Sequence, residues 1–189
     1  MMFMKEVKLR DIADVFSGLS YRRYLEDNGN EFEVIVQRSI KNDGIFDDFE
    51  QLTLKSDIKD RYFSKNEDVL MKMNYPYNVV CCNREGLIIS DRIAIIRLKQ
   101  GFSPLFISHL LNNAHIKKQL HEHGNNEKTP HISLKEIKEL TLRVPDLDTQ
   151  IKYGNLLNVI DEKIAEDLKL IRHDRNLKEG ILNKLWDVD

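Results

Sequence analysis

The segment from Thr149 to Trp186 limits the possible folds most strongly, because it contains no proline and places apolar residues at intervals of three or four. That spacing is typical of one long helix with a single apolar face. Such a helix would extend about 57 Å at 1.5 Å per residue, well beyond a domain built from the preceding residues. Its apolar face therefore needs a second helix. We expect the dimerisation residues to be Tyr153, Leu157, Ile160, Ile164, Leu168, Ile171, Ile181, Leu182 and Leu185.

The sequence changes character between Val144 and Gln150, which divides the chain into residues 1–147 and residues 148–189. Short apolar runs separated by turn-forming residues dominate the first part and indicate a compact mixed sheet. We predict an α+β fold, in which a mixed α/β domain precedes one long C-terminal helix. The expected helices are Lys8–Phe16, a core-facing stretch from Ser103 to Gly124 and a short capped helix after Ser133; the expected strands begin at Glu33 and continue at Asp68–Met73, Asn78–Cys82, Leu87–Ser90, Arg92–Leu98 and Thr141–Val144.

Charge and cysteine usage narrow the class of protein. The 29 Lys and Arg residues are balanced by 31 Asp and Glu, which argues against a polybasic arm, although residues 61–146 hold 13 basic and 9 acidic residues. Cys81 and Cys82 are adjacent within an apolar run, which favours reduced thiols and a cytoplasmic protein. No apolar run approaches the roughly 18 residues that span a bilayer, so we expect no membrane segment.

Two patterns suggest catalysis and neither is complete. Pro145 and Asp146, followed by Asp161–Lys163, imitate a nuclease metal site, but the second cluster lies in the predicted long helix instead of a neighbouring strand. Asn74–Tyr77 loosely resembles the acceptor motif of amino-methyltransferases, but no glycine-rich turn is present to hold an adenosyl cofactor. We therefore expect no catalytic residue, no metal ligand and no cofactor.

Polar side chains in the predicted loops between strands are of the types that contact DNA phosphates or base edges. Solvated loops are usually polar, so each of these residues is ordinary when taken alone. The candidate DNA contacts are Arg38, Lys41, Lys72, Asn74, Tyr77, Arg84, Asn126, Lys128, Thr129 and His131.

A family resemblance gives these candidates a context. The segment ISLKEIKELTLRVPDLDTQ, residues 132–150, continues as IKYGNLLNVIDEKI. It resembles the end of a target-recognition domain and the start of the conserved helix in the specificity (S) subunits of type I restriction-modification systems. That family pattern has a short helix, a strand ending in proline, and a glutamine that opens a long helix. The matching residues are Pro145, Gln150, Tyr153, Leu157 and Asp161.

Further short matches occur along the chain. VKLRDIADVFSG, residues 7–18, is similar to the family's opening helix and glycine, and PLFISHLL, residues 104–111, is similar to the helix after its sheet. EDVLMK, residues 67–72, resembles the start of a family strand, with Glu67 in place of the usual glycine. Residues 20–60 match nothing specific.

The resemblance implies a non-catalytic subunit that reads double-stranded DNA while a methyltransferase (M) subunit and a restriction (R) subunit carry the chemistry. An ordinary S subunit has two recognition domains and two conserved helices, whereas this chain has room for one of each. It therefore resembles a half-length form, for which we expect an antiparallel homodimer and an interrupted palindromic target. Two alternatives remain open: a coiled-coil scaffold that binds other proteins, and an inactive fragment of a specificity gene.

Overall fold

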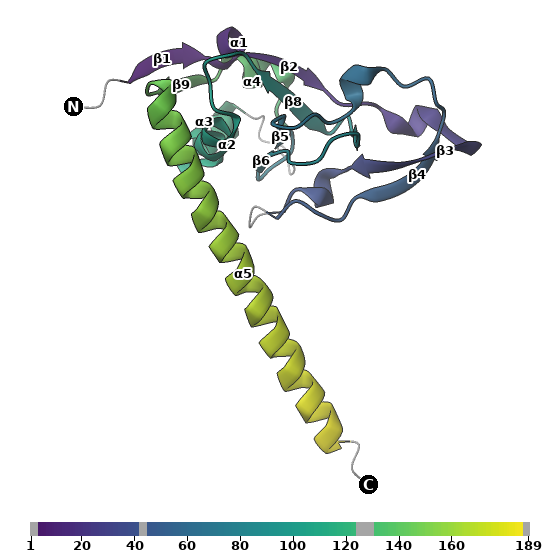
Figure 1. The fold of residues 1–189 in the computed structure, drawn as a ribbon. Helices are drawn as coiled ribbons and strands as arrows, with labels where there is room; N and C mark the ends of the chain where they lie inside the picture. The colour runs from purple at the N-terminus through teal and green to yellow at the C-terminus, as the bar shows by residue number, and fades with distance from the viewer. Residues whose placement is uncertain (1–3, 42–44, 124–130, 187–189) are drawn as a thin grey trace.

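The computed structural model describes residues 4–41, 45–123 and 131–186. A mixed α/β domain occupies one end of the molecule, and the helix α5 (Leu147–Trp186) projects from it as a single rod (Figure 1). This arrangement confirms the predicted α+β class and the long C-terminal helix. The helix starts slightly earlier than expected because Asp146 caps it. Its carboxylate accepts hydrogen bonds from the backbone N–H of Thr149 at 3.0 Å and from the Thr149 hydroxyl at 2.9 Å.

The described strands form three sheets. The central sheet has the order β2 (Ala13–Ser17), β8 (Ile93–Leu98), β5 (Val69–Lys72) and β6 (Val79–Cys81), all antiparallel. A second sheet contains β4 (Glu50–Leu54), β3 (Leu25–Ile35) and β7 (Ile88–Ile89), and a third pairs β1 (Lys5–Lys8) with β9 (Thr141–Val144). The remaining elements are α1 (Leu9–Ile12), α2 (Pro104–Asn112), α3 (Ala114–His123), α4 (Leu134–Glu139) and the short 3₁₀ turns Tyr21–Tyr24, Gln37–Ser39 and Asp60–Tyr62.

The central sheet is covered on both faces, which explains the uninterrupted apolar run of β8. On one face Val69 and Met71 pack with residues of α2, α3 and α4. On the other face Leu70 packs with Ile35 and neighbouring residues of a second cluster. The sheet is therefore the centre of the core, and the strand ends and connecting turns are held against it.

The prediction of a helix over Lys8–Phe16 is wrong in its second half. The helix is confined to Leu9–Ile12, and Ala13–Ser17 is the edge strand β2. In β2 the buried Ala13 and Val15 flank the exposed Asp14, which is the two-residue alternation of a strand. The segment is so short that its apolar residues also fit the spacing of a helix. Pairing with β8 decides between the two.

The second sheet is larger than the sequence indicates. Strand β3 begins at Leu25 instead of near Glu33, and it pairs with β4, which was not predicted. Most of the N-terminal part of β3 is exposed, so the apolar alternation that marks a half-buried strand is missing there. The two strands form the arm at the side of the domain away from α2 (Figure 1).

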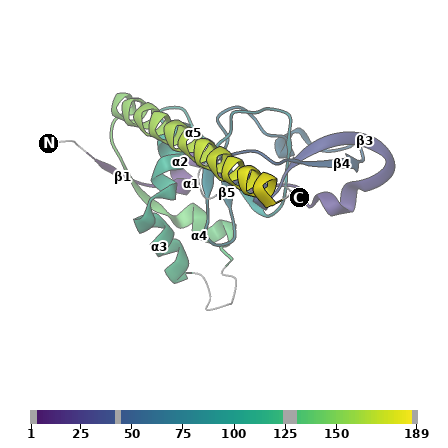
Figure 2. The same cartoon turned by 90° about the horizontal axis from the view of Figure 1, so that it is seen from below.

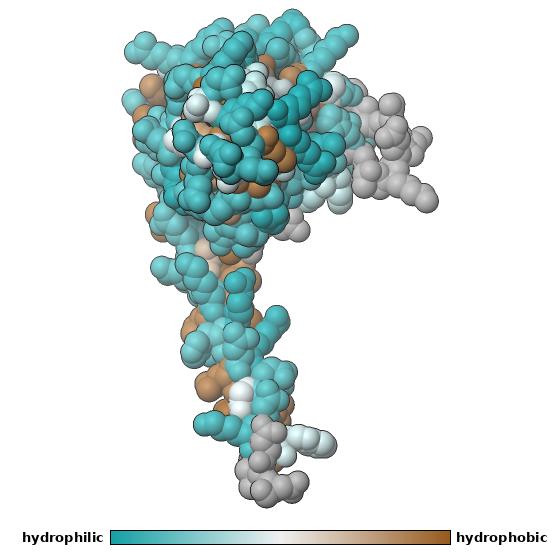
Figure 3. All heavy atoms as spheres, turned by 90° about the vertical axis from the view of Figure 1, so that its right-hand side faces the viewer, coloured by the Kyte–Doolittle hydropathy of each residue, from teal (hydrophilic) through white to brown (hydrophobic). Residues whose placement is uncertain are grey.

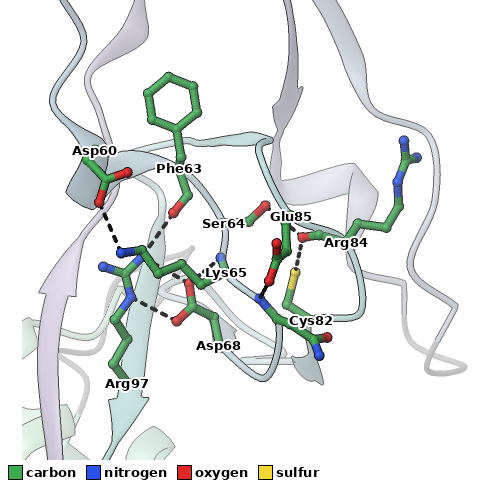
Figure 4. Close-up of polar contacts among 10 residues, drawn as sticks. Asp60, Phe63, Ser64, Lys65, Asp68, Cys82, Arg84, Glu85 and Arg97 are labelled. Atoms are coloured by element: carbon green, nitrogen blue, oxygen red, sulfur yellow. Dashed lines mark hydrogen bonds and ion pairs between the residues drawn. The ribbon is translucent and has the colours of Figure 1, made fainter.

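A largely buried ion pair joins Arg97 of β8 to Asp68, which directly precedes β5 (Figure 4). Arg97 Nε donates to Asp68 Oδ1 at 2.8 Å, and its Nη2 donates to Asp68 Oδ2 at 3.1 Å and to the Phe63 carbonyl at 2.9 Å. The backbone N–H of Lys65 also donates to Asp68, which is almost fully buried. Each charge is thereby paired, as burial requires.

Replacing Asp68 with alanine should lower the free energy of unfolding by about 3–5 kcal/mol, because Arg97 would keep its position without a counter-charge. Urea unfolding at a fixed protein concentration measures the loss. Asp60→Ala is the matched control, since Asp60 forms a solvent-exposed pair with Lys65 and should have little effect. Equal stability of the two variants would contradict the assigned role of Asp68.

Candidate nucleic-acid interface and docking helix

Three of the predicted DNA contacts lie in the same region of the domain. Lys72 ends β5, and Asn74 lies in the turn that follows it. Asn74 forms an isolated antiparallel bridge with His131, which is distant in sequence. Gln37, which was not predicted as a contact, donates from Nε2 to Asn74 Oδ1 at 3.1 Å. The fold thus brings together residues with amide, imidazole and ammonium side chains from three separate segments.

Three other predicted contacts, Arg38, Lys41 and Arg84, each form an ion pair with an acidic side chain. The Arg84 guanidinium also lies over the Phe49 ring, 4.8 Å from its centroid. These cations are therefore already partly neutralised within the chain, and any DNA contact would compete with the internal pairs. The ion pairs are Arg38 with Asp48 and Glu50, Lys41 with Asp47, and Arg84 with Glu33.

Tyr77 lies inside the core instead of on the surface. Its side chain is fully buried, so we remove it from the proposed set of DNA contacts. Tyr75 is the exposed tyrosine of this turn, with 62% of its surface accessible, and its ring lies 5.5 Å from the His121 ring between centroids. Sequence alone does not decide which tyrosine of a turn points inward. Asn126, Lys128 and Thr129 lie outside the described residues.

Helix α3 adds a lysine that the sequence analysis missed. Lys117 Nζ donates to Asn78 Oδ1 at 3.0 Å, and Lys72 Nζ donates to the Ile40 carbonyl at 3.3 Å. Burial lowers the pKa of both ammonium groups, and the charge of Lys72 further lowers the pKa of Lys117. Lys72 therefore lies close enough to Lys117 to affect its ionisation, and Lys117 contacts Asn78 in the turn that also holds Asn74 and Tyr75.

The first turns of α5 are seated on α2 (Figure 2). Gln150, which is 2% exposed, accepts from the Ser103 backbone N–H at 3.0 Å and donates to the Pro145 carbonyl at 2.9 Å. A Cβ at Gly154 would meet the Phe106 nitrogen at 3.0 Å, so glycine permits this close approach. We call Gln150, Gly154 and Asp161 the helix seat.

Asp161 completes the seat through His109 of α2. His109 Nδ1 lies 3.4 Å from Asp161 Oδ2. Burial lowers the pKa of His109, and the Asp161 carboxylate partly opposes that effect. The two aspartates that imitate a nuclease site thus have structural contacts, Asp146 as the cap of α5 and Asp161 as the partner of His109. Among the described residues, no group of three or more His, Cys, Asp or Glu side chains is placed to hold a metal ion.

Beyond the seat, α5 is largely uncovered. Every residue from Lys169 to Trp186 is exposed, and Figure 3 shows apolar side chains along the projecting rod among hydrophilic ones. Of the predicted dimerisation residues, Leu168 is partly buried and the others are exposed: Tyr153, Leu157, Ile160, Ile164, Ile171, Ile181, Leu182 and Leu185. We call this set the predicted stripe. Within the described part of the chain, no helix is long and apolar enough to cross a membrane.

A second apolar face lies beside the predicted stripe and was not anticipated. Leu156, Val159, Leu170 and Leu177 are exposed. At about 100° per residue they lie roughly 100° around the helix from the centre of the predicted stripe and opposite the helix seat. The apolar arc is therefore wider than the seam of a two-stranded coiled coil requires.

The comparison with family models decides the identity of the fold. The family described as "Type I restriction modification DNA specificity domain" matches residues 3–185. The chain belongs to this family. The resemblance inferred from short motifs is thereby confirmed for this specificity domain over nearly its whole length. No curated protein matches it.

Solved structures share the fold of this specificity domain. The HsdS subunit from Thermoanaerobacter tengcongensis matches with a TM-score of 0.68 and 16% identity, over 96% of this chain and 48% of that chain. A type I restriction-modification S subunit from M. genitalium gives 0.65 and 15%, over 100% and 47%. A chain from the structure described as "Structural basis underlying complex assembly and conformational transition of the type I R-M system" gives 0.65 and 17%, over 96% and 43%. The specificity domain spans about half the length of each.

The burial of His109 predicts a pH dependence of stability. Because the pKa of His109 is lowered below 6.5 on folding, the unfolded chain binds the proton first as the pH falls. This component of stability is present above about pH 6.5 and is lost as the pH drops toward the lower folded value. Urea unfolding between about pH 7.5 and about pH 5.5 should therefore show a smaller loss for His109→Gln than for wild type. His173→Gln, at an exposed position of α5, is the control and should behave as wild type.

Proposed function

We propose that this specificity domain acts as the DNA-recognition (S) subunit of a type I restriction-modification complex. The family match over residues 3–185 carries the proposal, because it includes both the mixed domain and nearly all of α5. Residues 1–147 form the target-recognition domain that reads double-stranded DNA, and residues 148–189 dimerise and dock other subunits. The M and R subunits carry the chemistry, so the chain itself is not an enzyme. A cytoplasmic location follows from that role.

The proposed form is an antiparallel homodimer that pairs the predicted stripes of two copies. Exposed apolar residues along the projecting rod support it, since an isolated helix of this kind gains little stability without tertiary cover. Two-fold symmetry would place two identical recognition domains along the duplex and give an interrupted palindromic target. The second apolar face, opposite the helix seat, stays exposed in such a pair, and we propose that it binds the M subunit.

The homodimer predicts that light scattering at micromolar concentration gives twice the mass of the chain. Ile164→Asp should raise the dimer dissociation constant at least about 100-fold, because roughly 3 kcal/mol or more is lost when a carboxylate enters an apolar seam. Lys169→Asp introduces the same residue off both apolar faces and should leave the dimer intact. Circular dichroism confirms that both variants remain helical. A monomeric wild type would overturn the homodimer.

The proposed function predicts that the chain co-purifies with a methyltransferase subunit encoded beside it and directs methylation to an interrupted palindrome. Sequencing that detects modified bases maps the methylated sites. Leu177→Asp should weaken co-purification while preserving the homodimer, because it alters only the second apolar face. Lys169→Asp is again the control. Co-purification without methylation would favour the inactive fragment, and a homodimer that neither binds nor directs a methyltransferase would favour the scaffold.

A further inference from the structure

Lys72 and Lys117 come from different elements and meet at Asn78. The backbone N–H of Lys72 donates to the Asn78 carbonyl at 2.9 Å, and Lys117 Nζ donates to Asn78 Oδ1 at 3.0 Å. Both lysine side chains are partly buried. Strand β5 and helix α3 therefore bring the two lysines to one asparagine, Lys72 through its backbone and Lys117 through its ammonium group, while the Lys72 ammonium group donates to the Ile40 carbonyl.

The charges of these two lysines lack a counter-charge in the part of the chain that the structure describes. Their acceptors are a carbonyl and an amide oxygen, and neither lysine forms an ion pair with a described carboxylate. Lys41, Arg84 and Arg97 all hold acidic partners. Burial lowers the pKa of both ammonium groups, and the charge of Lys72 lowers the pKa of Lys117 further, so the fold keeps two cations in a place where a bound anion would stabilise them.

Local structure does not require the charge at Lys117. A glutamine side chain also donates a hydrogen bond to an amide oxygen, so the link to Asn78 is available without a cation. A bound anion explains why position 117 carries a positive charge, which the hydrogen bond to Asn78 does not require. An ammonium group is a compact point charge that suits a phosphate oxygen.

The surroundings match a nucleic acid. His121 follows Lys117 by one helical turn on the same side of α3, and its ring packs against the exposed ring of Tyr75. Asn74 lies two residues after Lys72 and is held by Gln37. Amide and aromatic side chains beside paired cations are the groups that contact DNA backbone and base edges.

We infer that Lys72 and Lys117 together bind one backbone phosphate of the DNA duplex. This inference rests on the proposed function and deepens it, because it assigns a phosphate contact to α3, which the sequence analysis left out. The shared phosphate positions the duplex beside Asn74 and Tyr75 without reading its sequence.

The test measures DNA affinity of the complex with the methyltransferase subunit over a series of salt concentrations, using a duplex that contains the mapped site and one that lacks it. Each phosphate neutralised contributes about 0.9 to the slope of log K against log salt, which corresponds to roughly eightfold in affinity near 0.1 M salt. Lys117→Gln and Lys72→Gln should each lose part of that slope on both duplexes, because the remaining ammonium group still neutralises part of the phosphate charge. Because the phosphate is shared, the double variant should lose about 0.9 in slope in total. A loss near 1.8 would overturn the shared site.

Lys99→Gln is the matched control. Lys99 Nζ also donates to a backbone carbonyl, and Lys99 follows the end of β8 that lies away from Lys72. It should retain the wild-type slope, and Lys117→Arg should restore the slope that Lys117→Gln loses. Thermal unfolding checks that each variant folds.

The outcomes separate the site from the proposed function. A wild-type complex that neither binds nor methylates DNA overturns the proposed function and the phosphate site with it. A wild-type complex that methylates its target while Lys117→Gln and Lys72→Gln bind as wild type overturns the site alone. Sodium phosphate is the second probe. A free phosphate is the ligand, and the DNA assignment fails, if sodium phosphate raises the Tm of wild type but not that of Lys117→Gln while both proteins bind DNA equally.

Discussion

The proposed assembly depends on the apolar surface of α5 that the domain leaves exposed. Only the first turns of the helix pack on the domain, through Gln150 and Gly154, and the remainder presents apolar side chains to water. Burying such surface gains about 25 cal/mol per Å², so a rod of this length is most stable when other helices cover it. In the proposed homodimer the domain lies at one end of the assembly, and its sheet, held by the Asp68–Arg97 pair, supports the turns that carry polar side chains.

Much of the fold could be predicted because several elements carry local signals that tertiary structure reinforces. Ser103 caps α2, and Ser133 forms a capping box with Glu136 at the start of α4, as their positions in the sequence indicate. Prediction failed where two periods fit the same short segment, as in Lys8–Phe16, and where an exposed strand has no apolar alternation, as in β3. Glu67 shows another limit: its φ of 68° explains why glycine suits this position, yet the sequence alone shows only a glutamate.

The candidate site was only partly visible in the sequence. Lys72 and Asn74 could be chosen because they flank a turn between strands, where polar groups reach solvent. Lys117 could not be chosen, since a lysine in an amphipathic helix ordinarily points to water, and only the packing of α3 beside Asn78 brings it to Lys72. Tyr77 shows the reverse error, because a polar aromatic residue in a turn suggested exposure whereas the core encloses it.

The helix seat also fixes the rotational phase of the rod. Gln150 and Gly154 hold the base of α5 against α2, so the direction in which every later side chain points is set by its count from the seat. One residue inserted just after the seat would turn the distal rod by about 100° relative to the domain and lengthen it by about 1.5 Å. Both apolar faces would then point in a different direction relative to the domain. Seven inserted residues, nearly two full turns, would restore that alignment and move the distal end outward by about 10 Å. Changes of length in this helix are thus tolerated in steps, not continuously.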